Sequence, residues 1–229
     1  MKTCLKGWSV LLMLLLQLTA ARAQQTSANR DKIKHGRYTL LVINKDSSFN
    51  PAVKQKLEDV FFKVYPQLAD SFNKKTLKKV TFIIDPEYKG VAATSGGVVS
   101  YSPEWLRKHP EDVDVVTHEV MHIVQAYPSG SEPGWLTEGI ADYVRYAFGV
   151  DNENAGWKLP PYSSSQHYNQ SYRVTARFLL WLEKNVKPGI VKVLDASMRS
   201  QSYTPQLWQT LTGKSLDELW SSYAQHPEI

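Results

Sequence analysis

The stretch THEVMHIVQAY, residues 117–127, decides how the rest of the chain is interpreted. It places His118 and His122 four positions apart, with Glu119 directly after the first histidine. On a helix, residues i and i+4 share one face, so the two imidazoles can bind one metal ion. Glu119 is rotated by about 100° from His118 and can reach a water molecule on that ion without binding the ion itself. The spacing therefore predicts a zinc site in which Glu119 acts as a base.

The same stretch also has a purely structural interpretation. Four aliphatic residues give the helix a face that can pack into a core: Val113, Val116, Val120 and Ile123. The polar residues would then lie beside that core without any chemical role. The order H-E-x-x-H is nevertheless the arrangement found in zinc peptidases, and it favours the metal site.

A zinc site needs at least a third protein ligand, and the following segment supplies two candidates. PSGSEPGWLTEGIADYVRY, residues 128–146, first breaks the helix and then begins another, so the two helices should form an antiparallel hairpin. Glu138 then lies level with His122, and we expect it to be the third ligand. Asp142, one turn further along, lies level with His118 and can accept the N–H of its imidazole. The reverse assignment, with Asp142 as the ligand and Glu138 outside it, stays open.

Apolar periodicity predicts an α+β organisation. Two short β-branched runs, residues 37–44 and 78–85, indicate strands, and residues 51–72 between them have helical spacing. GGVVSYS, residues 96–102, indicates a third strand after a glycine-rich turn, and we expect it to be an edge strand beside the metal site that can pair with an extended peptide. Further helices are predicted at 103–109, 111–127, 134–148, 170–186, 188–198, 204–211 and 215–224. The prediction is a small N-terminal mixed sheet with helices, followed by a mainly helical C-terminal half, in a single domain over residues 37–229.

The N-terminus has the pattern of a secretory signal peptide. A basic start, an apolar run and a small-x-small site end at Ala23, so residues 1–23 are predicted to be removed on export. Cys4 is the only cysteine and would be removed with this leader, so the mature core would form without disulfides. Residues 24–36 are polar and unpatterned, which suggests a flexible mature N-terminus. We therefore expect a secreted protein, extracellular or periplasmic, with no stable membrane association after cleavage.

The charge balance argues against nucleic-acid binding. The formal net charge of the full sequence is +5, and the leader carries three basic and no acidic residues, so the rest of the chain would carry +2. That value is too small to suggest a polyanionic partner. A peptide or protein substrate is the partner that the metal site predicts.

Several stretches resemble the basic secretory protein family of plants and its bacterial relatives, which are similar to gluzincin-type zinc metallopeptidases. The resemblance rests on VVSYSPEWL, VTHEVMHIVQAY, PGWLTEGIADYVRYAFG, SYRVTARFLLWLE and LTGKSLDELWSSY, which span roughly residues 96–223. It implies a zincin-like metallopeptidase domain with a zinc ion, Zn²⁺, as the cofactor. The family pattern carries over onto five residues of this chain: His118, Glu119, His122, Glu138 and Asp142.

The resemblance also implies a residue that stabilises the oxyanion formed when a peptide carbonyl is attacked. In such peptidases a tyrosine or histidine outside the metal-binding helices often has this role; Tyr172 is our candidate and His167 the second choice. We therefore predict a secreted zinc peptidase in which a zinc-activated water attacks the peptide bond and Glu119 transfers the proton.

Two alternative functions are left open by the sequence. One is a zinc-containing secreted binding or defence protein without hydrolytic activity. The other is a hydrolase of glycans or esters, although the sequence has no second carboxylate pair and no G-x-S-x-G motif to support it.

Overall fold

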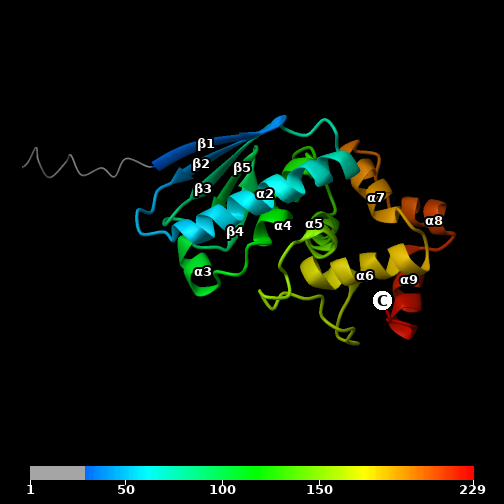
Figure 1. The fold of residues 1–229 in the computed structure, drawn as a ribbon. Coiled ribbons are helices and arrows are strands. Elements are labelled where there is room, and N and C mark those ends of the chain that lie inside the picture. The colour runs from blue at the N-terminus through cyan, green and yellow to red at the C-terminus, as the bar shows by residue number, and fades with distance from the viewer. Residues whose placement is uncertain (1–28) are drawn as a thin grey trace, which may run out of the picture.

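A mixed five-stranded sheet forms the N-terminal part of the molecule (Figure 1). The computed structural model describes residues 29–229, so the predicted signal peptide, residues 1–23, lies outside the described residues. The strands are β1 (Asn29–His35), β2 (Tyr38–Asn44), β3 (Lys79–Ile84), β4 (Ala92–Ser95) and β5 (Val98–Tyr101). Their order across the sheet is β1-β2-β3-β5-β4. Pairing is parallel in the middle of the sheet and antiparallel at both edges.

Helices pack against the sheet and make up most of the C-terminal half (Figure 1). They are α2 (Pro51–Ser71), α3 (Pro103–Lys108), α4 (Val115–Gln125), α5 (Gly134–Phe148), the short 3-10 helix η1 (Tyr168–Gln170), α6 (Tyr172–Asn185), α7 (Ile190–Arg199), α8 (Gln206–Thr212) and α9 (Leu216–Gln225). Within residues 29–229, no helix combines the length and the apolar character that a membrane crossing requires. The predicted α+β class, with a mixed sheet followed by a mainly helical half, is confirmed.

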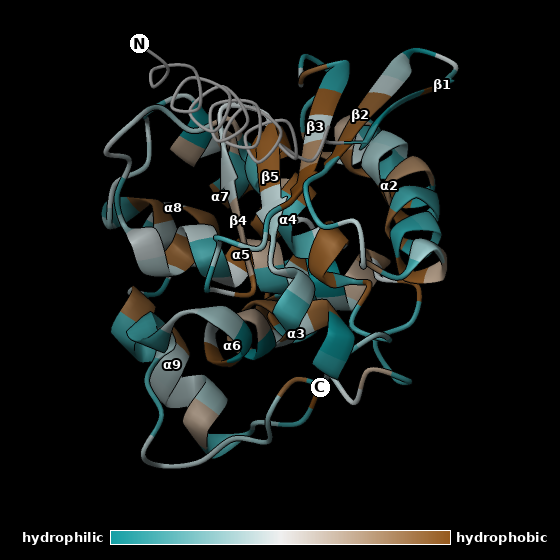
Figure 2. Cartoon of the chain, turned by 90° about the vertical axis from the view of Figure 1, so that its left-hand side faces the viewer, coloured by the Kyte–Doolittle hydropathy of each residue, from teal (hydrophilic) through white to brown (hydrophobic). Residues whose placement is uncertain are grey.

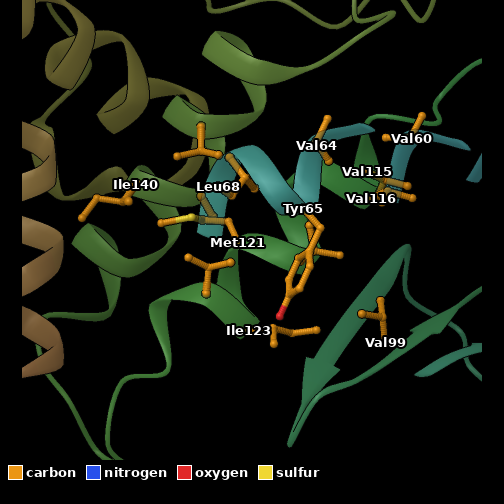
Figure 3. Packing of buried hydrophobic residues seen from close by; sticks show 14 of the residues in the cluster. Val60, Val64, Tyr65, Leu68, Val99, Val115, Val116, Met121, Ile123 and Ile140 are labelled. Atoms are coloured by element: carbon orange, nitrogen blue, oxygen red, sulfur yellow. The ribbon is translucent and has the colours of Figure 1, made fainter. Parts of the chain in front are cut away.

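The sheet buries one face under α2 and α4. Every second side chain of β2 and β3 is buried, as expected for strands with one covered face. Figure 2 shows hydrophobic residues along β2, β3 and β5. The core residues labelled in Figure 3 are Val60, Val64, Tyr65 and Leu68 of α2, Val99 of β5, Val115, Val116, Met121 and Ile123 of α4, and Ile140 of α5. Because α4 contacts β4, α2 and α5, the helix that carries the two histidines is held on several sides.

The prediction of a flexible N-terminus over residues 24–36 is wrong for residues 29–35. They form β1, which pairs antiparallel with β2 from Asn29 opposite Asn44 to His35 opposite Tyr38. An edge strand is held by backbone hydrogen bonds, and most side chains of β1 are exposed. A strand of this kind has no apolar alternation by which the sequence could reveal it.

The edge strand beside α4 is β4, and the prediction that GGVVSYS has this position is wrong. Gly96 and Gly97 form the turn of a hairpin, with φ angles of 54° and 81°. Successive positive φ angles are typical of tight hairpin turns, and glycine adopts them without strain. Val98–Tyr101 of the stretch form β5, which lies between β3 and β4. The preceding segment AATS, residues 92–95, is therefore the strand beside α4 whose outer side pairs with no other strand.

Candidate metal centre

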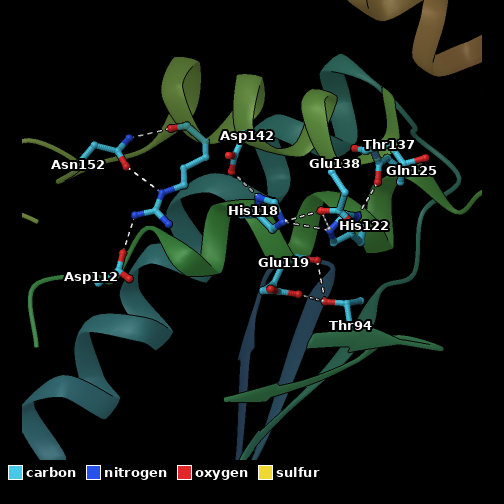
Figure 4. Close-up of polar contacts among 11 residues, drawn as sticks. Thr94, Asp112, His118, Glu119, His122, Gln125, Thr137, Glu138, Asp142 and Asn152 are labelled. Atoms are coloured by element: carbon cyan, nitrogen blue, oxygen red, sulfur yellow. Dashed lines mark hydrogen bonds and ion pairs between the residues drawn. The ribbon is translucent and has the colours of Figure 1, made fainter. Parts of the chain in front are cut away.

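The helices α4 and α5 bring the four predicted metal-site residues together. Ala126 caps the C-terminus of α4; it has a left-handed φ of 45° and donates its N–H to the carbonyl of His122. The chain then reverses direction into α5, so that His122 faces Glu138 and His118 faces Asp142. The result is an antiparallel hairpin with one histidine and one carboxylate at each of two levels (Figure 4).

Three side-chain atoms converge between these helices (Figure 4). His118 Nε2 lies 3.2 Å from His122 Nε2 and 3.3 Å from Glu138 Oε2, and His122 Nε2 lies 3.6 Å from the same oxygen. A tetrahedral zinc ion at about 2.0–2.1 Å from each ligand atom would separate these atoms by roughly 3.3 Å. In the described part of the chain, this is the one group of three His, Cys, Asp or Glu side chains that meets so closely.

The other nitrogen of each imidazole has a hydrogen-bond acceptor. His118 Nδ1 donates to Asp142 Oδ1 at 2.7 Å, because an ionised carboxylate can only accept. Gln125 Nε2 donates to the Thr137 carbonyl at 2.9 Å, so Gln125 turns its Oε1 toward His122 Nδ1 at 2.7 Å, and that nitrogen is the donor. In the neutral imidazoles both Nε2 atoms are then unprotonated, and with Glu138 they aim three lone pairs at one point. Only a cation stabilises such an arrangement, so these residues fit a zinc ion. Glu138 would then be the third ligand, and Asp142 would accept the hydrogen bond from His118.

The electrostatics of the group show the same need for positive charge. Burial by itself lowers the pKa of His118, but the hydrogen bonds to Asp142 and Glu138 raise it to about 10. Burial also acts to raise the pKa of Glu138, but the two histidines outweigh it and hold this pKa far below its ordinary value. A proton and a metal ion would therefore compete for the same imidazole nitrogen atoms.

Glu119 lies next to this group without joining it. Its side chain is only 6% exposed and lines the same cavity as His118. The hydroxyl of Thr94, on β4, lies 2.7 Å from Glu119 Oε2 and 3.0 Å from the Glu119 carbonyl oxygen. It can donate to the ionised carboxylate, and it can accept from the protonated one while donating to the carbonyl. Thr94 thus connects the edge strand to Glu119 in both protonation states.

Tyr172 stands at the start of α6 with its ring over the metal group. The ring centroids of Tyr172 and His118 are 6.2 Å apart, and Tyr172 is 54% exposed and lines the same cavity as His118 and Glu119. Ser171 and Tyr172 have φ angles of 63° and 48°, a conformation that costs about 1–3 kcal/mol per non-glycine residue. The charge of Glu138 raises the pKa of the Tyr172 hydroxyl, which keeps it a hydrogen-bond donor. His167, the second choice, packs against Tyr168 and Trp220 and does not line this cavity.

A cavity of about 1110 Å³ connects these residues. It follows the α4–α5 hairpin on one side and β4 on the other, and its lining includes Glu119, Glu138 and Tyr172. Close packing fixes the far side of α5, where a Cβ at Gly139 would lie 2.2 Å from Cγ2 of Thr175 on α6. The helices that frame the cavity are therefore held in place by direct contact.

Two contacts in this site were not predicted. Gln125 follows His122 by three positions on the same helix, so the i, i+3 spacing was available as a signal. Thr94 lies 25 positions before Glu119, on a strand that the sequence does not indicate, and no local pattern connects the two.

We expect Asp142→Ala to weaken zinc binding by about 10–100-fold, because His118 loses the acceptor that orients its ring and increases its basicity. Competition with a chromogenic chelator measures the zinc dissociation constant. Asp59→Ala, which removes an exposed carboxylate on α2, is the control and should bind zinc as the wild type does. An unchanged constant in Asp142→Ala would contradict the supporting role of this residue.

The fold is shared with zinc metallopeptidases of known structure. An M1 zinc metallopeptidase variant from Deinococcus radiodurans, bound to a Tyr-Ser-Ala substrate, matches with a TM-score of 0.53 at 14% identity, over 88% of this chain and 53% of its own. Aminopeptidase A of Legionella pneumophila, in complex with aspartic acid, matches with a TM-score of 0.56 at 15% identity, over 85% of this chain and 28% of its own. At such identities the likeness shows the fold alone, and the chain spans about half or less of the length of these proteins.

The sequence itself identifies the family. No curated protein is significantly similar to this chain. The family pattern of the peptidases of plants and bacteria, however, matches residues 29–223, which is most of the chain and includes every residue of the metal centre. The resemblance found in the sequence is thereby confirmed, and the chain belongs to the BSP family, the peptidases of plants and bacteria.

Proposed function

We propose that the protein is a secreted, zinc-dependent peptidase in which His118, His122 and Glu138 hold the ion. The observation that carries this proposal is the convergence of three ligand atoms within 3.6 Å of one another, with the two imidazoles oriented by Asp142 and Gln125. Family membership supports peptidase activity in general. The zinc ion, the residue roles and export are the proposed additions.

When bound, zinc would supply a Lewis acid that polarises a peptide carbonyl and makes water a stronger nucleophile. Glu119 takes a proton from the attacking water and delivers it to the leaving amine. Thr94 holds the Glu119 carboxylate in place while it changes its protonation state. The low exposure of Glu119 and His118, 6% and 9%, limits competition from bulk water for these hydrogen bonds.

The outer edge of β4 is the proposed site for the substrate backbone. One of its carbonyls, that of Ala92, already accepts from the Tyr88 hydroxyl at 2.8 Å, so pairing would use the other backbone groups. β4 pairs with β5 on one side only, and its residues Ala92 to Thr94 line the cavity. An extended peptide can add to such an edge through backbone hydrogen bonds, which do not depend on its sequence. The scissile carbonyl would then lie between β4 and the metal group.

Tyr172→Phe should lower kcat by about 10–100-fold and change KM little, because the hydroxyl would donate to an oxyanion that exists only after attack. Steady-state kinetics on a fluorogenic peptide separate the two constants. Tyr146→Phe, which alters an exposed tyrosine of α5 that does not line the cavity, should leave both unchanged. A rise in KM at constant kcat would assign Tyr172 to substrate binding instead.

The test of the proposed function is cleavage of a diverse peptide mixture, read by mass spectrometry. The zinc-loaded chain of residues 24–229 should cut it, and Glu119→Gln should not. A folded protein with one zinc per chain that cuts nothing would favour the alternative of a zinc-containing binding or defence protein. Sequencing of the secreted protein tests export separately, and we expect its N-terminus at Gln24.

A further inference from the structure

The cavity continues beyond His118 into an arm with a different lining. One helical turn before His118 on α4 lies Val115, and one turn beyond Asp142 on α5 lies Arg145; both line the cavity. From there the lining continues to residues of α3 and of the loop after α5. We call this region the tryptophan arm, and it is formed by Trp105, His109, Asp112, Val115, Arg145 and Trp157.

The walls of the tryptophan arm are two half-buried indoles that are held in place. Trp105 donates its indole N–H to Asp112 Oδ2 at 2.8 Å, and its ring centroid lies 4.1 Å from that of His109. Trp157 lies over the Arg145 guanidinium, whose carbon is 4.5 Å from the ring centroid. Fixed aromatic faces of this kind favour a flat, apolar side chain by stacking and by the area that they bury.

The charges within the arm are already compensated. Arg145 is 5% exposed; it forms an ion pair with Asp112 and donates from Nε to Asn152 Oδ1 at 3.0 Å (Figure 4). A charged substrate side chain in the arm would therefore meet an arginine and an aspartate that already pair with each other, and it would lose its hydration. An uncharged side chain avoids this cost.

The direction of β4 indicates which part of a substrate meets the arm. The N–H of Ser102, which caps α3, donates to the Val91 carbonyl at 3.1 Å, so the start of β4 lies beside the helix that carries Trp105. Thr94, further along β4, lies beside Glu119. A peptide that runs antiparallel to β4 therefore passes Glu119 first and reaches the arm with the residues that follow the cleaved bond.

We propose that the tryptophan arm binds the side chain of the residue that follows the cleaved bond and selects phenylalanine, tyrosine or tryptophan at that position. This inference rests on the proposed function, because it uses the position of Glu119 to define the cleaved bond. It goes beyond that function by naming the class of substrate.

Equilibrium binding tests the proposal without cleavage. Zinc-loaded Glu119→Gln is titrated in a calorimeter with the peptides acetyl-Ser-Ala-Ala-X-Ala-Ser-amide, in which X is Phe, Ala, Glu or Lys. We expect the Phe peptide to bind about tenfold or more tightly than the Ala peptide, and the Glu and Lys peptides no more tightly than the Ala peptide. Equal affinity for Phe and Ala would overturn the proposal. Preferred binding of the Glu peptide would also overturn it and would point to Arg173 at the cavity wall.

Two variants in the same background assign the preference to the arm. Trp157→Ala should reduce the ratio of Phe to Ala affinity to about twofold or less, and Ala155→Leu, which fills the cavity from the same loop, should do the same without removing a wall. Trp135→Ala, which removes a half-buried tryptophan that does not line this cavity, should keep the ratio. A ratio unchanged in both loop variants would overturn the proposal.

Cleavage data keep the two proposals distinguishable. If the proposed function is wrong, the peptide mixture will show no Glu119-dependent cuts. If only the tryptophan arm proposal is wrong, Glu119-dependent cuts will appear, but aromatic residues will not be enriched directly after the cleaved bond.

Discussion

Glu119→Gln is expected to lower kcat by about 10²–10⁴-fold while the protein keeps one zinc ion per chain. The amide has the shape of the carboxylate and can still hydrogen-bond to Thr94, so the neighbouring His118 and His122 should keep their positions. The amide cannot accept and release a proton as a carboxylate does, which removes general acid–base catalysis and leaves the metal and the binding groups intact. Turnover of a fluorogenic peptide and zinc content by plasma mass spectrometry measure the two parts of this prediction.

Glu104→Gln is the matched control for this change. Glu104 lies on α3, is exposed and pairs only with Lys108, so its replacement should alter neither turnover nor zinc content. If Glu119→Gln turned over substrate at the wild-type rate, the base would be another residue. If it lost zinc as well as activity, Glu119 would have a structural role in the centre, and the assignment of a base could not be kept.

Much of the fold could be predicted because its elements bury one face. The spacing of apolar residues in α2 and the strand runs of β2 and β3 reflect packing into a common core, and periodicity detects such packing. β1 and β4 lie at the two edges of the sheet and are stabilised by backbone pairing with β2 and β5. Because backbone pairing imposes no apolar pattern, both strands escaped prediction, and with them the identity of the strand that lines the cavity.

The contacts of the candidate site also fall into those that the sequence predicts and those that it does not. Helix geometry and a short connection are enough to bring Glu138 level with His122, and Asp142 level with His118, since each depends on residues close in sequence. The contact from Thr94 to Glu119 depends on how β4 packs against α4. The walls of the tryptophan arm depend likewise on α3 and on the loop after α5 meeting at one end of the hairpin. Contacts of this second kind follow from tertiary packing, which no local spacing records.

His122→Ala is expected to remove zinc retention and all measurable peptidase activity. The proposed centre has three protein ligand atoms, and His122 Nε2 is one of the two nitrogens among them. With two ligands left, the ion loses both a donor and the closed geometry that holds it, so zinc should fall from about one to below about 0.1 per chain after dialysis against a weak chelator. Because zinc bound to the folded state adds to its stability, we also expect a lower Tm for the variant than for the zinc-loaded wild type.

Two comparisons make this prediction specific. His226→Ala removes an exposed histidine near the C-terminus and should keep zinc, activity and Tm. Stripping zinc from the wild type with a strong chelator should bring its Tm down to near that of His122→Ala, because both proteins then lack the same ion. Equal zinc content in the wild type and His122→Ala would contradict the metal assignment. A variant that lost zinc but kept its peptidase activity would show that hydrolysis does not use this centre.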